Sequence, residues 1–413
     1  MTKSNATLFR LFGELSLVEK ATPGSEWIDG GGASALLWAL AAADATPLNE
    51  WAAAHALGPA EIAWLNAQGL SPFAYARLRE GGALLRLTAE SQEALRHAYY
   101  GAAIQAMARE GELIEVLDAL SQEQVTPILF KGAALAYTVY PSPACRLMGD
   151  LDLWLTAEEM PRAQAALERV GFVQRTRARR PLALQAQYAG EIQMVRTRPR
   201  SSLVELHWGI FAGEWLKRTA IADVAGVRRR ARAGPRFEQK GRALSTLILA
   251  PEDAMIQLAV HATVNHQLAA PWVRSLLDAA LLARRQGIDW AMVAARVRGW
   301  RMATAVWAFL FLARELVGLE EAGPALATLA PSSPRRRALS WLAAPRALLT
   351  MRDLTRGRAR FILLLSLIDR PSDMLRLLGR ALWPETEWLA ARYGEARPAT
   401  RLRHLLAAFR GRL

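Results

Sequence analysis

The chain has 413 residues, of which 52% are hydrophobic and 22% are charged, and its formal net charge is +14. This length exceeds one typical hydrophobic core, so we expect two or three structural units. No apolar stretch is long enough for a membrane span, the N-terminal twenty residues do not predict a signal peptide, and the single cysteine, Cys145, excludes an internal disulfide or a cysteine-based zinc site. We therefore expect a cytoplasmic globular protein.

The positive charge comes mainly from arginine, which is concentrated in residues 175–242 and from Arg352 onward. Guanidinium groups suit phosphate or carboxylate partners, so an acidic or phosphate-bearing partner is one interpretation and a nucleic-acid surface is another. A high-GC genome, which enriches Ala, Arg, Gly and Pro together, explains the same composition. Few aromatic residues lie among the arginines, and the charge alone does not decide between these interpretations.

The first part of the chain predicts helices. Apolar residues recur at helical spacing within residues 33–120, most clearly over 88–120, and we assign residues 1–120 to a helical N-terminal region. The pattern changes after Pro127, where short apolar runs predict strands at 128–130, 149–155, 172–173, about 187–195 and 202–208, with helices at 133–140 and 157–171.

This order predicts an α+β fold in which residues 121–243 form a mixed sheet covered by helices. From residue 244 the chain is helical again, with helices expected at 252–267, 272–285 and 361–368. We therefore expect a central α/β core flanked by helical N-terminal and C-terminal regions, the latter spanning 244–413.

The segment GDLDL is the strongest functional signal. In a strand, Asp150 and Asp152 share one face, while the leucines between and after them share the other. Two such charges about 4 Å apart repel by about 4 kcal/mol at an effective dielectric near 20. A shared proton, a nearby Lys or Arg, or a cation would offset this repulsion, and a divalent metal that binds a phosphate-bearing substrate is the interpretation we favour.

A second acidic strand, SLVELHW, places Glu205 and His207 together on one face. A third carboxylate beside an Asp pair is what metal-dependent phosphoryl transfer requires. His207 could position an acceptor or transfer a proton, and a structural histidine bonded to an acid is equally consistent. His261 and His266 lie five residues apart on a predicted helix, so we do not expect them to meet on one face as a metal-binding pair.

These residues carry a family resemblance. LFKGAALAYTVYPSPACRLMGDLDLWL followed by VELHW resembles the nucleotidyltransferase superfamily with the DNA polymerase β-like catalytic fold. Within it, the pattern is similar to a bacterial branch that is often encoded beside peptide natural-product genes, including lasso peptide clusters. The match is strong over residues 128–208 and weaker in the flanks, through GLSPFAYARL, the His261 region and Asp278.

The resemblance implies a role for each matched residue. Asp150 and Asp152 would bind Mg²⁺, with Mn²⁺ as an alternative, and through it the triphosphate of an NTP, for which ATP is expected. Glu205 would be the third metal ligand or the general base. The remaining matched residues on the nucleotide side are Lys131 (phosphate contact or a solvated strand end), Gly132 (close approach of phosphate), Arg146 (phosphate clamp or partner of an aspartate) and Gly149.

The resemblance thus implies an enzyme that moves an NMP from an NTP to a hydroxyl or phosphate acceptor, such as a peptide natural product, and releases pyrophosphate. The helical C-terminal region would select the acceptor. Three alternatives stay open: a nucleotide- or peptide-binding accessory protein without turnover, a transferase acting on RNA such as tRNA, and a transferase acting on a small molecule such as an aminoglycoside.

Overall fold

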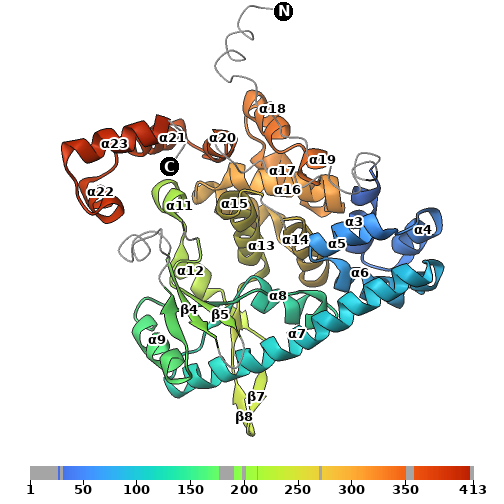
Figure 1. Ribbon diagram of the computed structural model, residues 1–413. Coiled ribbons are helices and arrows are strands. Elements are labelled where there is room, and N and C mark those ends of the chain that lie inside the picture. The colour runs from blue at the N-terminus through green and yellow to red at the C-terminus, as the bar shows by residue number, and fades with distance from the viewer. Residues whose placement is uncertain are drawn as a thin grey trace, which may run out of the picture.

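The computed structural model describes Trp27 and residues 31–175, 190–197, 201–211, 213–268, 272–349 and 358–409, so the stretch considered for a signal peptide lies outside the described residues. The first described part is helical, as predicted: α3 (Gly32–Ala41), α4 (Thr46–Ala54), α5 (Pro59–Ala67), α6 (Ser71–Glu80), the 3₁₀ turn η1 (Ala83–Arg86) and α7 (Ala89–Gln122). α7 runs along the lower edge of the molecule in Figure 1 and connects these helices to the sheet. The hydroxyl of Thr88 caps α7 by accepting a hydrogen bond from the amide of Ser91 at 3.2 Å.

A mixed sheet of seven strands lies at the centre of the described chain, in the order β3-β4-β5-β2-β1-β9-β6. β2 runs parallel to β5 and antiparallel to β1. The α+β prediction is confirmed, although the sequence did not indicate the short strands between residues 232 and 248. The strands are β1 (Ile128–Leu129), β2 (Leu151–Trp154), β3 (Val173–Arg175), β4 (Glu191–Arg196), β5 (Ser202–His207), β6 (Arg232–Ala233) and β9 (Leu247–Ile248), with β7 (Phe237–Gln239) and β8 (Arg242–Leu244) forming a separate hairpin.

The two faces of this sheet join different apolar cores, because successive side chains along a strand point to opposite sides. Leu151 and Leu153 of β2 and Leu206 of β5 pack into a core that also contains residues of α7 and α9 (Met160–Arg169). Ile128 of β1 and Trp154 of β2 point the other way, into the core formed by the helices. The sheet is therefore anchored from both sides, which fixes the positions of the polar side chains that it carries.

Helices dominate the chain after the sheet, as predicted. N-terminal and later helices share one apolar core, and α3 packs against both α14 and α16 (Figure 1). The remaining helical elements are α8 (Gly132–Thr138), η2 (Pro143–Cys145), α11 (Glu214–Thr219), α12 (Val224–Arg229), α13 (Pro251–Val260), the π-helical turn η4 (His261–Asn265), α14 (Val273–Gln286), α15 (Trp290–Gly299), α16 (Ala303–Val317), η5 (Glu320–Ala322), α17 (Gly323–Leu329), α18 (Ser333–Leu342), α19 (Pro345–Leu349), α20 (Arg358–Ser366), α21 (Pro371–Leu382), α22 (Thr386–Tyr393) and α23 (Pro398–Phe409).

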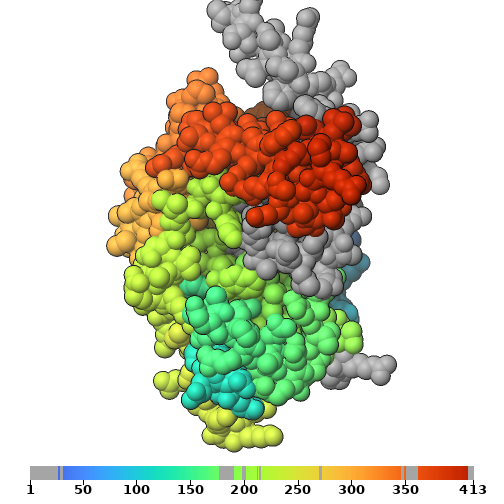
Figure 2. All heavy atoms as spheres, turned by 90° about the vertical axis from the view of Figure 1, so that its left-hand side faces the viewer, coloured from blue at the N-terminus to red at the C-terminus, as the bar shows by residue number. Residues whose placement is uncertain are grey.

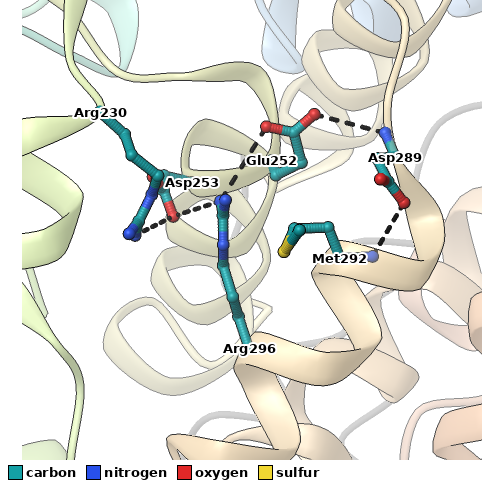
Figure 3. A network of polar contacts seen from close by, with 6 residues as sticks. All are labelled: Arg230, Glu252, Asp253, Asp289, Met292 and Arg296. Carbon is teal, nitrogen blue, oxygen red and sulfur yellow. Dashed lines mark hydrogen bonds and ion pairs between the residues drawn. The ribbon is translucent and has the colours of Figure 1, made fainter.

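A buried ion network holds α13 in place (Figure 3). Asp253 of α13 is fully buried and accepts two hydrogen bonds from Arg230, at 2.9 and 3.1 Å. Arg296 of α15 donates a third, at 2.8 Å. Next to it, Glu252 accepts the backbone N–H of Asp289, the residue that caps α15. Two arginines thus compensate one buried carboxylate and connect α12, α13 and α15.

The C-terminal helices lie across one end of the molecule, where they appear red above the green sheet region in Figure 2. α21 packs against α11, which follows strand β5 directly. Arg218 of α11 forms an ion pair with Glu385 at 3.4 Å, and the rings of Trp215 and Phe361 meet edge to face. Among the described helices, none combines the length and the apolar character that crossing a bilayer demands.

Candidate active site

Parallel pairing of β2 with β5 brings the two acidic strands together. The register places Asp152 beside Glu205 and Trp154 beside His207. Because Leu151, Leu153 and Leu206 fill the core on the opposite face, the polar residues must lie on the other side. Asp152, Glu205 and His207 are all buried, and one donor atom from each lies within 4.8 Å of the others. The period-two pattern of the sequence predicts this grouping.

Asp152 is the centre of the group. One oxygen, Oδ1, accepts hydrogen bonds from Lys131 Nζ at 2.7 Å and from His207 Nε2 at 2.9 Å. The same His207 nitrogen lies 3.5 Å from Oε2 of Glu205. The Lys131 side chain therefore points toward the carboxylates. It is not solvated at the end of a strand, which was the alternative role considered for it. Asp150 stands just before β2, partly buried, and is not part of the close group of three.

Strand β4 adds two residues that the sequence reasoning missed. Its antiparallel register with β5 places Gln193 beside Glu205 and Glu191 beside His207. Gln193 Nε2 donates to Glu205 Oε1, and Glu191 Oε2 lies 3.4 Å from His207 Nδ1. The alternation in EIQMVR, on a strand predicted near these residues, is the signal that could have identified them.

The charges in this group shift one another's pKa values. Burial alone would raise the pKa of Asp152, but the charge of Lys131 and the hydrogen bond from His207 outweigh it and lower the pKa. Burial and the charge of Lys131 would lower the pKa of His207, but its hydrogen bonds to Asp152 and Glu205 outweigh them and raise it. Burial and the charges of Asp152 and Glu205 raise the pKa of Asp150 to about 6. A cation near Asp150 would relieve this repulsion.

Lys131 and Gly132 join β1 to α8 through a backbone conformation that is rare for side-chain-bearing residues. Lys131 has φ 51° and ψ −132°, a region that favours glycine. In this conformation the Lys131 ammonium contacts Asp152. At Gly132 a Cβ atom would lie 3.2 Å from Met148 Cγ, so even alanine would need Met148 to move. At Gly149 a Cβ would meet nothing within 4 Å, and its carbonyl accepts a hydrogen bond from Arg109 at 3.1 Å.

Arg146 was expected either to contact phosphate or to pair with an aspartate, and in the structure it forms an ion pair with an aspartate. That aspartate is Asp278 of α14, which is fully buried and receives Arg146 Nε at 2.8 Å and Nη2 at 2.9 Å. The hydroxyl of Tyr140 donates a third hydrogen bond to Asp278, at 2.7 Å. The motif segment before Asp150 is therefore attached to the helical C-terminal part by a bidentate pair.

The expectation that His261 and His266 lie on different faces is wrong. The helix predicted over 252–267 changes at His261 into a π-helical turn, in which the amide of His266 donates to the carbonyl of His261 at 2.9 Å. A π turn brings residues i and i+5 together, and the two rings are 4.3 Å apart. Burial and then the charge of Lys131 lower the pKa of both histidines, so they lie within electrostatic reach of the carboxylate group.

A family model described as uncharacterised nucleotidyltransferase matches residues 59–318. The chain belongs to this family. No curated protein and no solved structure matches the chain significantly. The match begins at α5 and ends at α16, so it includes the sheet, the carboxylate group and the helices that carry His261 and Asp278. The protein is accordingly a transferase, and members of its class use an NTP and a divalent metal.

The donors of this nucleotidyltransferase fit a hard divalent cation. Asp152 and Glu205 supply buried carboxylate oxygens on adjacent strands, and Asp150 lies within electrostatic reach of both. Carboxylates flank both ring nitrogens of His207, and its hydrogen bonds to Asp152 and Glu205 raise its pKa. The group is thus compatible with metal binding, with Lys131 as a counter-charge and His207 hydrogen-bonded to the acids.

Proposed function

We propose that the protein is a Mg²⁺-dependent nucleotidyltransferase that moves an NMP from an NTP, with ATP as the expected donor, to a hydroxyl or phosphate acceptor and releases pyrophosphate. The observation that supports this most is the buried pair Asp152 and Glu205 on adjacent parallel strands of a chain that belongs to a nucleotidyltransferase family. A fold retains such a pair without loss of stability only where positive charge offsets the repulsion.

In this proposal Asp150, Asp152 and Glu205 would hold the metal, for which Mn²⁺ is an alternative, and the bound ion would supply positive charge for the triphosphate. Alternatively, Glu205 would act as the general base that takes the proton of an acceptor hydroxyl. The acceptor oxygen then bonds to the α-phosphorus as the bond from that phosphorus to the β-bridging oxygen breaks, and pyrophosphate leaves with the electron pair. His207 keeps Asp152 and Glu205 in position through its hydrogen bonds.

The nucleotide lies, in this proposal, on the side of Lys131, Gly132 and Gly149. The Lys131 ammonium carries a positive charge at the carboxylate edge, and the lack of a side chain at Gly132 lets the backbone of this connection pack closely against Met148. Arg146 acts through Asp278 as a positioning residue that fixes the segment before Asp150.

Acceptor selection is assigned to the helical region 244–413, which follows a helical region 1–120 and a catalytic core 121–243. Its arginines would meet an acidic or phosphate-bearing acceptor, and a peptide is the acceptor class we propose to test first. The contact of α21 with α11, directly after catalytic strand β5, supports a role for this region near the site.

The test incubates the protein with Mg²⁺ or Mn²⁺, each α-labelled NTP, and a panel of peptide, small-molecule and RNA acceptors. We expect label transfer and pyrophosphate release, both lost in Asp152→Asn. Glu238→Gln, which alters an exposed acid on the separate hairpin strand β7, serves as the matched control and should keep parental activity. A parent protein that binds no NTP and releases no pyrophosphate would contradict the proposal. Transfer to RNA, with affinity falling steeply as salt rises, would instead identify RNA as the acceptor.

A further inference from the structure

Two arginines converge on the segment that precedes Asp150. Arg146 Nη1 and Arg274 Nη1 both donate to the carbonyl of Leu147, at 2.9 and 3.0 Å. Arg274 comes from the first turn of α14, more than a hundred residues later in the chain. Two positive charges therefore meet at one neutral acceptor, three residues before the first aspartate of the site.

The nearby aspartate Asp278 forms hydrogen bonds with only one of them, Arg146. Both oxygens of Asp278 already accept from Arg146, and Oδ1 also accepts from the hydroxyl of Tyr140. In the part of the chain that the structure describes, Arg274 forms no ion pair with a carboxylate, and its one side-chain hydrogen bond is to Leu147. Burial and then the charge of Arg146 outweigh the attraction of Asp278 and lower the pKa of Arg274 to about 10, so its charged form is held at a cost.

The Arg274 guanidinium lies near the part of the proposed site where we place the nucleotide. Arg146 Nη1 lies 3.7 Å from the place of a Cβ on Gly132, so the arginine pair stands beside the Lys131–Gly132 connection. Asp150 is close enough to influence the pKa of Arg274. Arg274 Nη1 also lies 3.3 Å from the place of a Cβ on Gly69, in the loop between α5 and α6.

Arg284, which lies on the same helix, is an arginine with a structural role and serves as a comparison for Arg274. Its guanidinium donates to the carbonyls of Ala41 and Gly318 and faces Glu321. It ties α14 to the ends of α3 and α16 and has a carboxylate partner. Arg274 has neither several acceptors nor an acid partner.

We propose that Arg274 binds the triphosphate of the nucleotide, whose negative charge supplies the partner that this guanidinium lacks within the described chain. The inference rests on the proposed function and adds to it a phosphate-binding residue from the helical C-terminal part. A guanidinium presents a planar fork that suits phosphate oxygens, and the carbonyl of Leu147 holds it in one orientation.

The experiment compares the parent, Arg274→Met, Arg274→Lys and the control Arg284→Met. Calorimetry with Mg²⁺ and ATP, and with Mg²⁺ and tripolyphosphate, measures binding, and thermal unfolding without nucleotide measures stability. We expect Arg274→Met to bind both compounds roughly tenfold or more weakly, because a charge-assisted hydrogen bond is lost. Its thermal midpoint should equal or exceed that of the parent, since a charge without an acid partner has been removed. Arg274→Lys should recover part of the affinity.

Arg284→Met should show the opposite pattern: a lower thermal midpoint and parental affinity. Parental binding of ATP and tripolyphosphate by Arg274→Met would overturn the inference while leaving the proposed function intact. A fall in its thermal midpoint like that of Arg284→Met would also overturn it, because Arg274 would then be structural. If the parent itself binds no NTP, the inference and the proposed function both fail.

Discussion

Asp150 is a carboxylate whose charge the fold holds at a cost, and Asp150→Asn tests this. Burial together with the charges of Asp152 and Glu205 raises its pKa from 3.8 to about 6. A rise of this size corresponds to about 3 kcal/mol against the native state at neutral pH. Asp150 is partly exposed, so solvent screening reduces this to about 1–3 kcal/mol. We therefore expect Asp150→Asn to be more stable than the parent at pH 7.5 when EDTA is present.

The sign follows from proton linkage. Because the native pKa lies above the unfolded value, the native protein holds the proton more tightly, and the stability that this provides is lost as the pH rises through about 6. At pH 4.5 the advantage of Asp150→Asn should shrink to about a third of its value at pH 7.5.

Thermal unfolding at the two pH values, with EDTA, is the assay. The expected rise of the thermal midpoint at pH 7.5 is about 1–3 °C. Glu238→Gln, an exposed acid on the β7 hairpin, should leave the midpoint unchanged at both pH values. A midpoint for Asp150→Asn equal to or below that of the parent at pH 7.5 would refute the reasoning that Asp150 is held at a cost.

Three further substitutions test the surrounding network. Lys131→Met should lower the thermal midpoint in EDTA, because the carboxylate of Asp152 loses an ion pair of 2.7 Å, and added Mn²⁺ should restore more stability than it adds to the parent. An unchanged midpoint would contradict this. Tyr140→Phe removes a hydrogen bond to buried Asp278 and should cost about 1–2 kcal/mol in thermal or urea unfolding, without affecting metal affinity. Asp253→Asn leaves two arginines without their shared carboxylate and should cost about 3–5 kcal/mol, read as a loss of thermal stability; a neutral effect would mean that the network is not stabilising.

Local patterns were sufficient to predict the acidic face of the sheet. The alternation of polar and apolar residues in GDLDL and SLVELHW assigns each carboxylate to one face of its strand. The leucines must be buried in the core on the opposite face, so this assignment does not depend on which strand lies beside it. The order of strands and helices likewise predicted the α+β class. The short strands β6 and β9 were missed, because two-residue pairings carry almost no pattern of their own.

The histidine pair shows where local reasoning was wrong. A spacing of five residues separates side chains on an α-helix, and the sequence carries no clear signal for the π turn that brings His261 and His266 together. For Arg146 the sequence left two roles open, and only the structure identified Asp278, more than a hundred residues later, as its partner. The contact of Arg274 with the carbonyl of Leu147 was not accessible from the sequence, because no local pattern relates these two segments.

The sequence by itself determined which side chains share the acidic face, because the two-residue period of a strand is a local property. The tertiary structure alone decided how the charges are paired: Lys131 and His207 on Asp152, Asp278 on Arg146, and Arg274 with a carbonyl only. Pairing depends on distances of a few ångströms between segments remote in the chain, and Coulomb energies at such distances change by several kcal/mol with burial. A local sequence pattern does not predict those distances.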